Sequence, residues 1–280
     1  MKFDTYANRG GAFPLARTML SAWALAGLLL LSGCIIADID DDDDFGRTDF
    51  VARADFSLEV DVTNEIRIRL EAINGNVEII GQRDATSVKA SGEQSVGSHS
   101  RADAERRLDN LFVEVEDLGD EIVIRTVQPR DTQGRNYTVN YTITLPVDLD
   151  VVTELINGNV TVDNIDASVS VINVNGNVHL RDVTGSATVL LTNGNIDSEV
   201  FLPIDGIVEL TTTNGNITLE IPQSTSASLN ARVTNGAISL SNLDLSDAES
   251  TNRSLTGMLG EGDGSIDLRT VNGNIGVSGF

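Results

Sequence analysis

Apolar and polar residues alternate on both sides of a tripeptide, Asn-Gly-Asn, that recurs along most of the chain. Three positions after its first Asn there is always a valine or isoleucine, and six positions before it there is always an apolar residue. Alternation with a period of two is typical of half-buried β-strands. Each copy therefore predicts two strands joined by a tight turn. The copies begin at Asn74, Asn157, Asn175, Asn193, Asn214 and Asn272, and a variant, Asn-Gly-Ala, begins at Asn235.

These turns fit two arrangements, because Asn and Gly both tolerate positive φ. In an antiparallel meander each tripeptide is a hairpin turn. In a parallel β-solenoid it is a corner of each rung, meaning each turn of the coil. We favour the solenoid because steps of 18–21 residues between Asn157 and Asn235 would stack like residues, including the asparagines in a hydrogen-bonded ladder. Parallel crossovers are almost always right-handed. The predicted fold class is an all-β, right-handed parallel β-solenoid with rungs of 18–21 residues.

A small insert separates the first two copies. Its predicted elements are, in order, a short strand over 86–90, a helix over 101–110 capped by Ser98 or Ser100, a hairpin of 111–115 with 121–127, and a strand over 137–145 with Tyr137, Val139, Tyr141 and Ile143 on one face. Residues 243–263 are polar and rich in Gly and Ser, which predicts a loop. Phe280 falls in the column of Ile165, Val183 and Phe201, where we expect it to help close the end of the coil.

The N-terminus has the pattern of a signal peptide, which predicts where the protein is located. Three basic residues precede an apolar run, Met19–Leu31, that is too short to span a bilayer stably. The run ends in Leu-Ser-Gly-Cys, which resembles the lipobox of bacterial lipoproteins and implies cleavage before Cys34 and its lipidation. Ile35 stands where lipoproteins kept at the inner membrane often carry Asp, so the resemblance implies the outer membrane. The alternative is an ordinary signal peptide with an incidental cysteine.

Charge and cysteine content narrow the function. The chain has 19 Lys+Arg and 42 Asp+Glu, which gives a net charge of −23 that becomes −25 after cleavage. This charge argues against a nucleic-acid partner, because a phosphate backbone requires a basic surface. A single cysteine excludes a disulfide framework and a thiolate metal cage. The run Asp40–Asp44 predicts a solvated tether, with a weak Ca²⁺ site as the alternative.

The predicted division is a signal peptide (1–33), a lipidated tether (34–50), an N-terminal part with the insert (51–145) and the repeat solenoid (146–280).

The stretch Tyr141–Asp150, YTITLPVDLD, leads directly into Asn-Gly-Asn-Val repeats, and an earlier copy precedes the helix and hairpin. This pattern resembles a bacterial family of proposed adhesins found in the cell envelope, over roughly residues 51–280. The resemblance implies a β-solenoid-like domain. The family has no established catalytic residues, so it assigns none to this chain.

Catalytic chemistry has little support. The two histidines, His99 and His179, fit exposed surface positions, and neither a phosphate-binding loop nor a His-Glu-x-x-His helix is present. A carbohydrate-cleaving β-helix would need paired carboxylates on one face. The candidates for such a pair are Asp163, Asp166, Asp182 and Asp197.

We therefore predict a non-catalytic, lipid-anchored binding or scaffold module without cofactor or metal. It would lie at the outer membrane, on either side, and its partner would be an envelope protein or a glycan. The alternatives are a structural or stress-sensing lipoprotein without an external ligand and, third, a carbohydrate-active enzyme.

Overall fold

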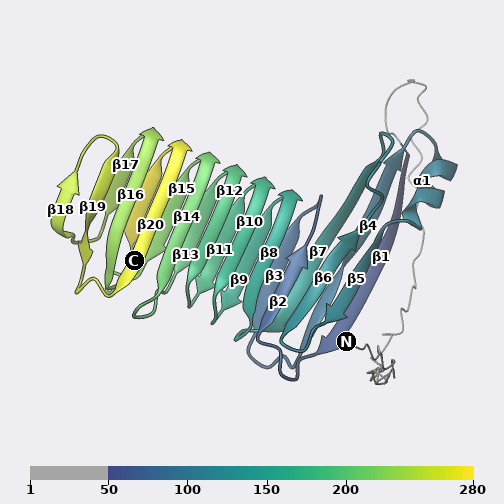
Figure 1. The fold of residues 1–280 in the computed structure, drawn as a ribbon, viewed down its shortest axis with the longest axis horizontal. Helices are drawn as coiled ribbons and strands as arrows, with labels where there is room; N and C mark the ends of the chain where they lie inside the picture. Colours follow the sequence, from purple (N-terminus) through teal and green to yellow (C-terminus); the bar gives the residue numbers. More distant parts are fainter. Residues whose placement is uncertain (1–49) are drawn as a thin grey trace, which may run out of the picture.

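Two long β-sheets face each other along the whole molecule in the computed structural model, which describes residues 50–280 (Figure 1). The signal peptide, Cys34 and the acidic run lie outside the described residues. The ten-stranded sheet contains, in spatial order, β1 (Phe50–Asp61), β4 (Ser87–Ser98), β7 (Asn136–Pro146), β3 (Val77–Gln82), β9 (Val160–Ile165), β11 (Val178–Val183), β13 (Ile196–Val200), β15 (Ile217–Ile221), β21 (Ile275–Gly279) and β17 (Ile238–Ser241). The eleven-stranded sheet contains β18 (Ser246–Ser250), β19 (Ser254–Leu259), β16 (Ala227–Asn235), β20 (Gly264–Asn272), β14 (Ile207–Asn214), β12 (Ala187–Asn193), β10 (Val169–Asn175), β8 (Asp150–Asn157), β2 (Arg67–Glu71), β6 (Glu121–Val127) and β5 (Phe112–Asp117).

The repeat strands pair in parallel, as a solenoid requires. Val169 lies opposite Val151 on one side and Ala187 on the other, so equivalent residues of successive copies are neighbours. This pairing excludes the antiparallel meander for the repeat segment. The inward columns are valine, isoleucine and leucine, and they form one continuous core between the sheets. The handedness of the coil stays a prediction.

The rungs do not stack in chain order, which corrects the spacing expected from the sequence. The last rung, β20 and β21, lies between the rung of β14 and β15 and the rung of β16 and β17. Asn214 is therefore next to Asn272, and the 21-residue step from Asn214 to Asn235 does not separate neighbours. Both edges of the last rung are hydrogen-bonded, so the C-terminal segment is interior to the stack.

Two expectations about this end of the coil were wrong. Residues 243–263 contain an antiparallel hairpin, β18 with β19, in place of a loop, and β19 pairs with β16. Phe280 follows β21, which lies inside the stack between β15 and β17, so it does not close the end of the coil. Phe280 instead packs edge-on against Phe201, with ring centroids 5.5 Å apart, and remains 51% exposed.

The insert largely follows its prediction. The single helix among the described residues, α1 (Arg101–Leu108), is capped by Ser100, whose side chain accepts a hydrogen bond from the backbone N–H of Asp103. The β5–β6 hairpin and β7 are present, and the predicted face of β7 is buried. The strand expected over 86–90 is longer: β4 runs to Ser98 and pairs antiparallel with β1 and β7. Within residues 50–280, no helix has the length and apolarity to cross a membrane.

Glycine at the middle of each tripeptide lets the rungs approach. The seven glycines have φ between +123° and +158°, a region that favours glycine. A Cβ built on Gly194 would lie 2.0 Å from the carbonyl oxygen of Gly176 in the rung below. Five other copies give the same contact with a neighbouring glycine, and Gly75 gives it with the carbonyl oxygen of Val139. Neighbouring strands must stand about 4.7–4.9 Å apart to hydrogen-bond. A side chain at this position would force neighbouring rungs apart.

We predict that Gly194→Ala destabilises the domain by at least about 3 kcal/mol, because a clash between rungs adds to the cost of positive φ. Gly119→Ala is the matched control, since Gly119 also has positive φ (+92°) but a Cβ there meets nothing within 4 Å. It should cost only about 1 kcal/mol. Denaturant unfolding monitored by circular dichroism measures both values. Equal losses for the two variants would contradict the role of close stacking.

Candidate functional site

The first asparagine of each tripeptide lies in a continuous row along one corner of the coil. We call this the first-asparagine row; its members, in spatial order, are Asn74, Asn157, Asn175, Asn193, Asn214, Asn272 and Asn235. Each side-chain Nδ2 donates to the Oδ1 of the residue before it, at 2.7–2.8 Å. The row begins with Asn74 donating to the carbonyl oxygen of Tyr137. The amide ladder expected from the sequence is thus present, in a different order.

The second asparagine of each tripeptide forms a parallel row with another pattern. This second-asparagine row contains Asn76, Asn159, Asn177, Asn195, Asn216 and Asn274. Each Oδ1 accepts the backbone N–H of the equivalent residue in the next rung, at 2.8–3.0 Å. No described residue bonds their Nδ2 groups, which leaves a row of amide donors at the corner. All except the half-buried Asn177 are exposed.

The position of the variant copy explains its sequence. The N–H of Ala237 donates to Oδ1 of Asn274, at 2.9 Å. The ten-stranded sheet ends at β17, so among the described residues no further rung would use an acceptor at position 237. The second asparagine of the tripeptide therefore has no backbone N–H to accept at this corner, and alanine can replace it.

Sequence reasoning missed a third set of corner residues, which lie two positions before the tripeptide. Asn173, Thr212 and Thr270 are buried, and their side chains donate to the carbonyl oxygens of Gly158, Gly194 and Gly215. Polar residues in an otherwise apolar inward column were the available signal. Their hydrogen bonds satisfy glycine carbonyls inside the corner.

An apolar patch lies beside this corner on the outer face of the eleven-stranded sheet. It consists of Ile156, Ile172, Val174 and Leu190, which are 38–52% exposed. Ile172 lies directly opposite Leu190 in the parallel register of β10 and β12. Exposed threonines of β12 and β14, Thr188, Thr192 and Thr213, continue the face. Two exposed glutamates lie beside them: Glu154 is opposite Ile172, and Glu209 is opposite Thr188. The patch, these threonines and the two asparagine rows consist of uncharged residues, and we call them together the uncharged surface; the two glutamates lie beside it.

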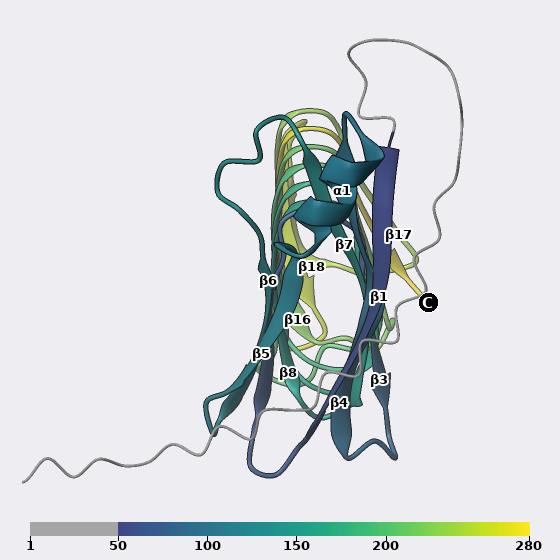
Figure 2. The ribbon, with the colours of Figure 1, turned by 90° about the vertical axis from the view of Figure 1, so that its right-hand side faces the viewer.

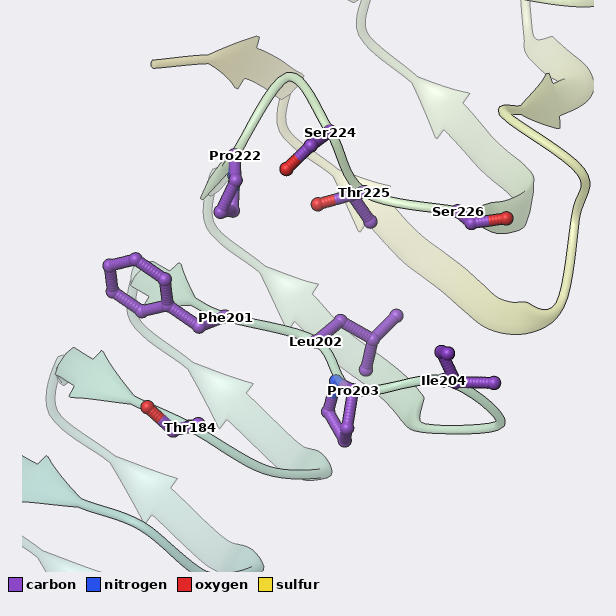
Figure 3. Close-up of a pocket in the computed structure, with 9 residues that line it drawn as sticks. All are labelled: Thr184, Phe201, Leu202, Pro203, Ile204, Pro222, Ser224, Thr225 and Ser226. Atoms are coloured by element: carbon purple, nitrogen blue, oxygen red, sulfur yellow. The ribbon is translucent and has the colours of Figure 1, made fainter.

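A hollow of about 340 Å³ opens at the opposite corner of the coil (Figure 3). It lies between the β13–β14 and β15–β16 connections, where the last rung is inserted. Phe201, Leu202, Pro203 and Ile204 form one side and Pro222 to Ser226 the other, and no lining side chain is charged. The hydroxyl of Ser226 is already bonded to the N–H groups of Glu261 and Gly262. The same hydroxyl donates to the carboxylate of Asp263, at 2.8 Å, so it is held within the β19–β20 connection. None of the residues that line the hollow is a histidine, a cysteine or a charged residue.

The structure spreads the candidate carboxylates among separate partners. Asp166 pairs with Arg83 (3.1 Å), and Asp197 lies 3.3 Å from Nδ1 of His179. Asp163 stands beside Arg181 on the neighbouring strand, whereas Asp182 is exposed at positive φ. His99 is exposed. Among residues 50–280, no three His, Cys, Asp or Glu side chains are grouped so that they could hold a metal.

The strongly shifted pKa values belong to structural contacts. A hydrogen bond from Arg135 and another from Ser98 lower the pKa of Asp103 to about 2. Burial raises the pKa of Tyr141 to about 12, although its hydroxyl bonds that of Thr126. The first contact ties α1 to the loop before β7, and the second joins β6 to β7. Neither group faces the uncharged surface.

We predict a graded cost along the first-asparagine row. Asn193→Ala removes two ladder bonds and should destabilise the domain by about 1–2 kcal/mol. Asn235→Ala, at the end of the row, removes one and should cost about half as much. Denaturant unfolding of both variants gives the comparison. A larger loss at Asn235 would contradict the order of the row.

Comparisons with known proteins give a family and several distant structures. The Toastrack DUF4097 family model matches residues 75–278. A search of curated proteins gave no match. A proposed cell adhesion protein from Clostridium sporogenes is 15% identical, with a TM-score of 0.47 over 81% of this chain and 100% of that one. A proposed adhesin from Bacteroides fragilis is 12% identical, with a TM-score of 0.33 over 81% of this chain and 97% of that one. A proposed lipid-binding protein from Parabacteroides distasonis is 13% identical, with a TM-score of 0.24 over 81% of this chain and 95% of that one.

The family match begins within the first tripeptide and ends in the last strand of the solenoid, so it contains nearly all of both asparagine rows. The chain belongs to the Toastrack DUF4097 family.

Proposed function

We propose that this protein is a non-catalytic binding module of the bacterial cell envelope that holds a neutral glycan on its uncharged surface. The observation that carries the proposal is the continuity of the apolar patch with the threonines and the second-asparagine row. A sugar ring has an apolar C–H face and hydroxyl groups around its rim. The apolar patch can contact the C–H face of the ring, and the threonine hydroxyls and amide N–H groups can form hydrogen bonds with the ring hydroxyls.

The geometry favours a polymer as ligand. The amide donors of the second-asparagine row recur once per strand, at a spacing of about 4.7–4.9 Å. Each of these side chains is held in place because its Oδ1 accepts a backbone N–H from the next rung. A repeating polymer can present one group to each donor. The net charge of −23 disfavours anionic polymers.

The double variant Ile172→Ser/Leu190→Ser should weaken glycan binding at least tenfold while the fold is kept, because both side chains are exposed. Ile204→Ser is the matched control, since Ile204 is 78% exposed but lies at the opposite corner. Binding of the purified chain to isolated envelope polysaccharide, measured by co-sedimentation, is the assay. Absence of binding, or equal effects of patch and control variants, would reject the proposal. Capture of only an envelope protein would favour a protein partner, and no capture at all would favour a structural or stress-sensing role.

The proposal includes lipid anchoring through Cys34 and location at the outer membrane. Its support is the sequence: the charged and apolar N-terminus, the Leu-Ser-Gly-Cys motif, and Ile35 after the cysteine. The acidic run at Asp40–Asp44 would act as a solvated spacer that holds the module away from the membrane. We also propose a right-handed coil, because parallel crossovers are almost always right-handed.

Cys34→Ala should move the protein from the membrane fraction to the soluble fraction of fractionated cells, because the lipid acceptor is lost. Ser32→Ala keeps both the cysteine and a small residue before it, and should leave the protein in the membrane fraction. Immunoblotting of the two fractions gives the result. A Cys34→Ala protein that stays with the membrane would show that the anchor is elsewhere.

A further inference from the structure

The Asn-Gly pair in each of the seven tripeptides is chemically labile. The backbone nitrogen of the glycine can attack Cγ of the preceding asparagine, because glycine has no side chain to hinder the approach. The glycine nitrogen gives its proton to solvent, the bond from Cγ to Nδ2 breaks, and ammonia leaves behind a cyclic succinimide. Water then opens the ring to aspartate or isoaspartate. The reaction therefore needs a glycine N–H that solvent can reach and an asparagine side chain that can turn.

Six of the seven pairs are each held by three hydrogen bonds that oppose this reaction. At Asn193, Nδ2 donates to Asn175 at 2.8 Å and Oδ1 accepts from Asn214 at 2.7 Å. The N–H of Gly194 donates to the carbonyl oxygen of Asn214, at 2.9 Å. All three bonds must break before the glycine nitrogen can attack Cγ. The same three groups are bonded in the pairs at Asn74, Asn157, Asn175, Asn214 and Asn272.

The seventh pair, Asn235 and Gly236, keeps one of these three bonds. Nδ2 of Asn235 donates to Oδ1 of Asn272, at 2.8 Å. Within residues 50–280, neither Oδ1 of Asn235 nor the N–H of Gly236 has a hydrogen-bond partner. Gly236 is also exposed, whereas the other six glycines are half-buried. The attacking nitrogen is thus open to solvent at this pair alone.

The cause is the position of this copy in the stack. Successive corners lie one behind another along the coil, as Figure 2 shows, and each glycine N–H donates to the corner that follows it in the row. The corner between β16 and β17 is the last one, since the ten-stranded sheet ends at β17. The β18–β19 hairpin continues the other sheet, but its bonds to β16 end at Val233, whose N–H donates to the carbonyl oxygen of Arg253. The hairpin therefore stops short of Asn235.

We propose that Asn235 is a site of spontaneous deamidation, and that the fold confines this reaction to the last corner by protecting the other six. The product loosens the last rung. A carboxylate at position 235 has no donor for Oδ1 of Asn272 and places a negative charge against that oxygen. Isoaspartate also adds a methylene group to the backbone, at a corner where a Cβ on Gly236 would already lie 1.8 Å from the carbonyl oxygen of Gly273.

The test is peptide mapping by mass spectrometry of the folded full chain during incubation at mildly alkaline pH. The deamidated fraction is followed with time at all seven sites. Asn235 should react at least about tenfold faster than each of the other six, because two fewer hydrogen bonds must break. In guanidinium-unfolded chain all seven should react at similar rates, since every one of these asparagines is followed by glycine.

Ala237→Asn is the matched control for sequence. It makes the seventh copy Asn-Gly-Asn like the others but adds no rung, so Asn235 should remain the fastest site. Circular dichroism checks that the variant is folded; if it is not, the folded and unfolded wild-type chains decide the result. Equal rates at Asn235 and Asn193 in the folded chain overturn the proposal. A fast Asn235 that becomes slow in folded Ala237→Asn also overturns it, since local sequence and not position would then be the cause.

Discussion

The close approach of one rung to the next at the glycine corner is the constraint on which the rest of the structure depends. The backbone carbonyl of each glycine occupies the space where a side chain on the next glycine would stand. With no side chain there, neighbouring rungs reach hydrogen-bonding distance along their whole length. Both asparagine rows and the stacked apolar columns follow from that spacing. The buried threonine and asparagine side chains that bond the glycine carbonyls reinforce the same corner.

Because every corner offers nearly the same donors and acceptors to both of its neighbours, the stack accepts a rung out of order. The C-terminal rung enters between two earlier rungs, and its two edges are hydrogen-bonded there. The chain must first reverse direction to reach this place, which the β18–β19 hairpin does. At one end of the coil the hairpin extends the eleven-stranded sheet beyond β16, and at the other end β1 is the outermost strand of the ten-stranded sheet.

The distribution of charge separates the surfaces of the molecule. Carboxylates pair with arginines around the insert and across neighbouring strands, and the most shifted carboxyl pKa, that of Asp103, belongs to such a contact. The apolar patch, its threonines and the asparagine rows carry no charge. This division of the surface suits recognition of a neutral partner more than catalysis, which would need an acid or base in a recess.

Much of the fold could be predicted from the sequence because its causes are local. Period-two alternation around each tripeptide, the positive φ that Gly permits, and the cap at Ser100 each act within a few residues, so the strands, corners, helix and β5–β6 hairpin were predictable. The parallel arrangement was also predictable, because only stacking rewards the same residue type in every copy.

The tertiary structure alone decided which rung lies against which. Repeated columns look alike from either side, so the sequence contains no local signal that places Asn272 between Asn214 and Asn235. The hairpin formed by residues otherwise typical of a loop, the hollow beside Phe201 and the position of β1 at the edge of its sheet all depend on that order or on how the two sheets end. The contacts that determine these features join residues far apart in the chain, whereas sequence patterns report mainly on near neighbours.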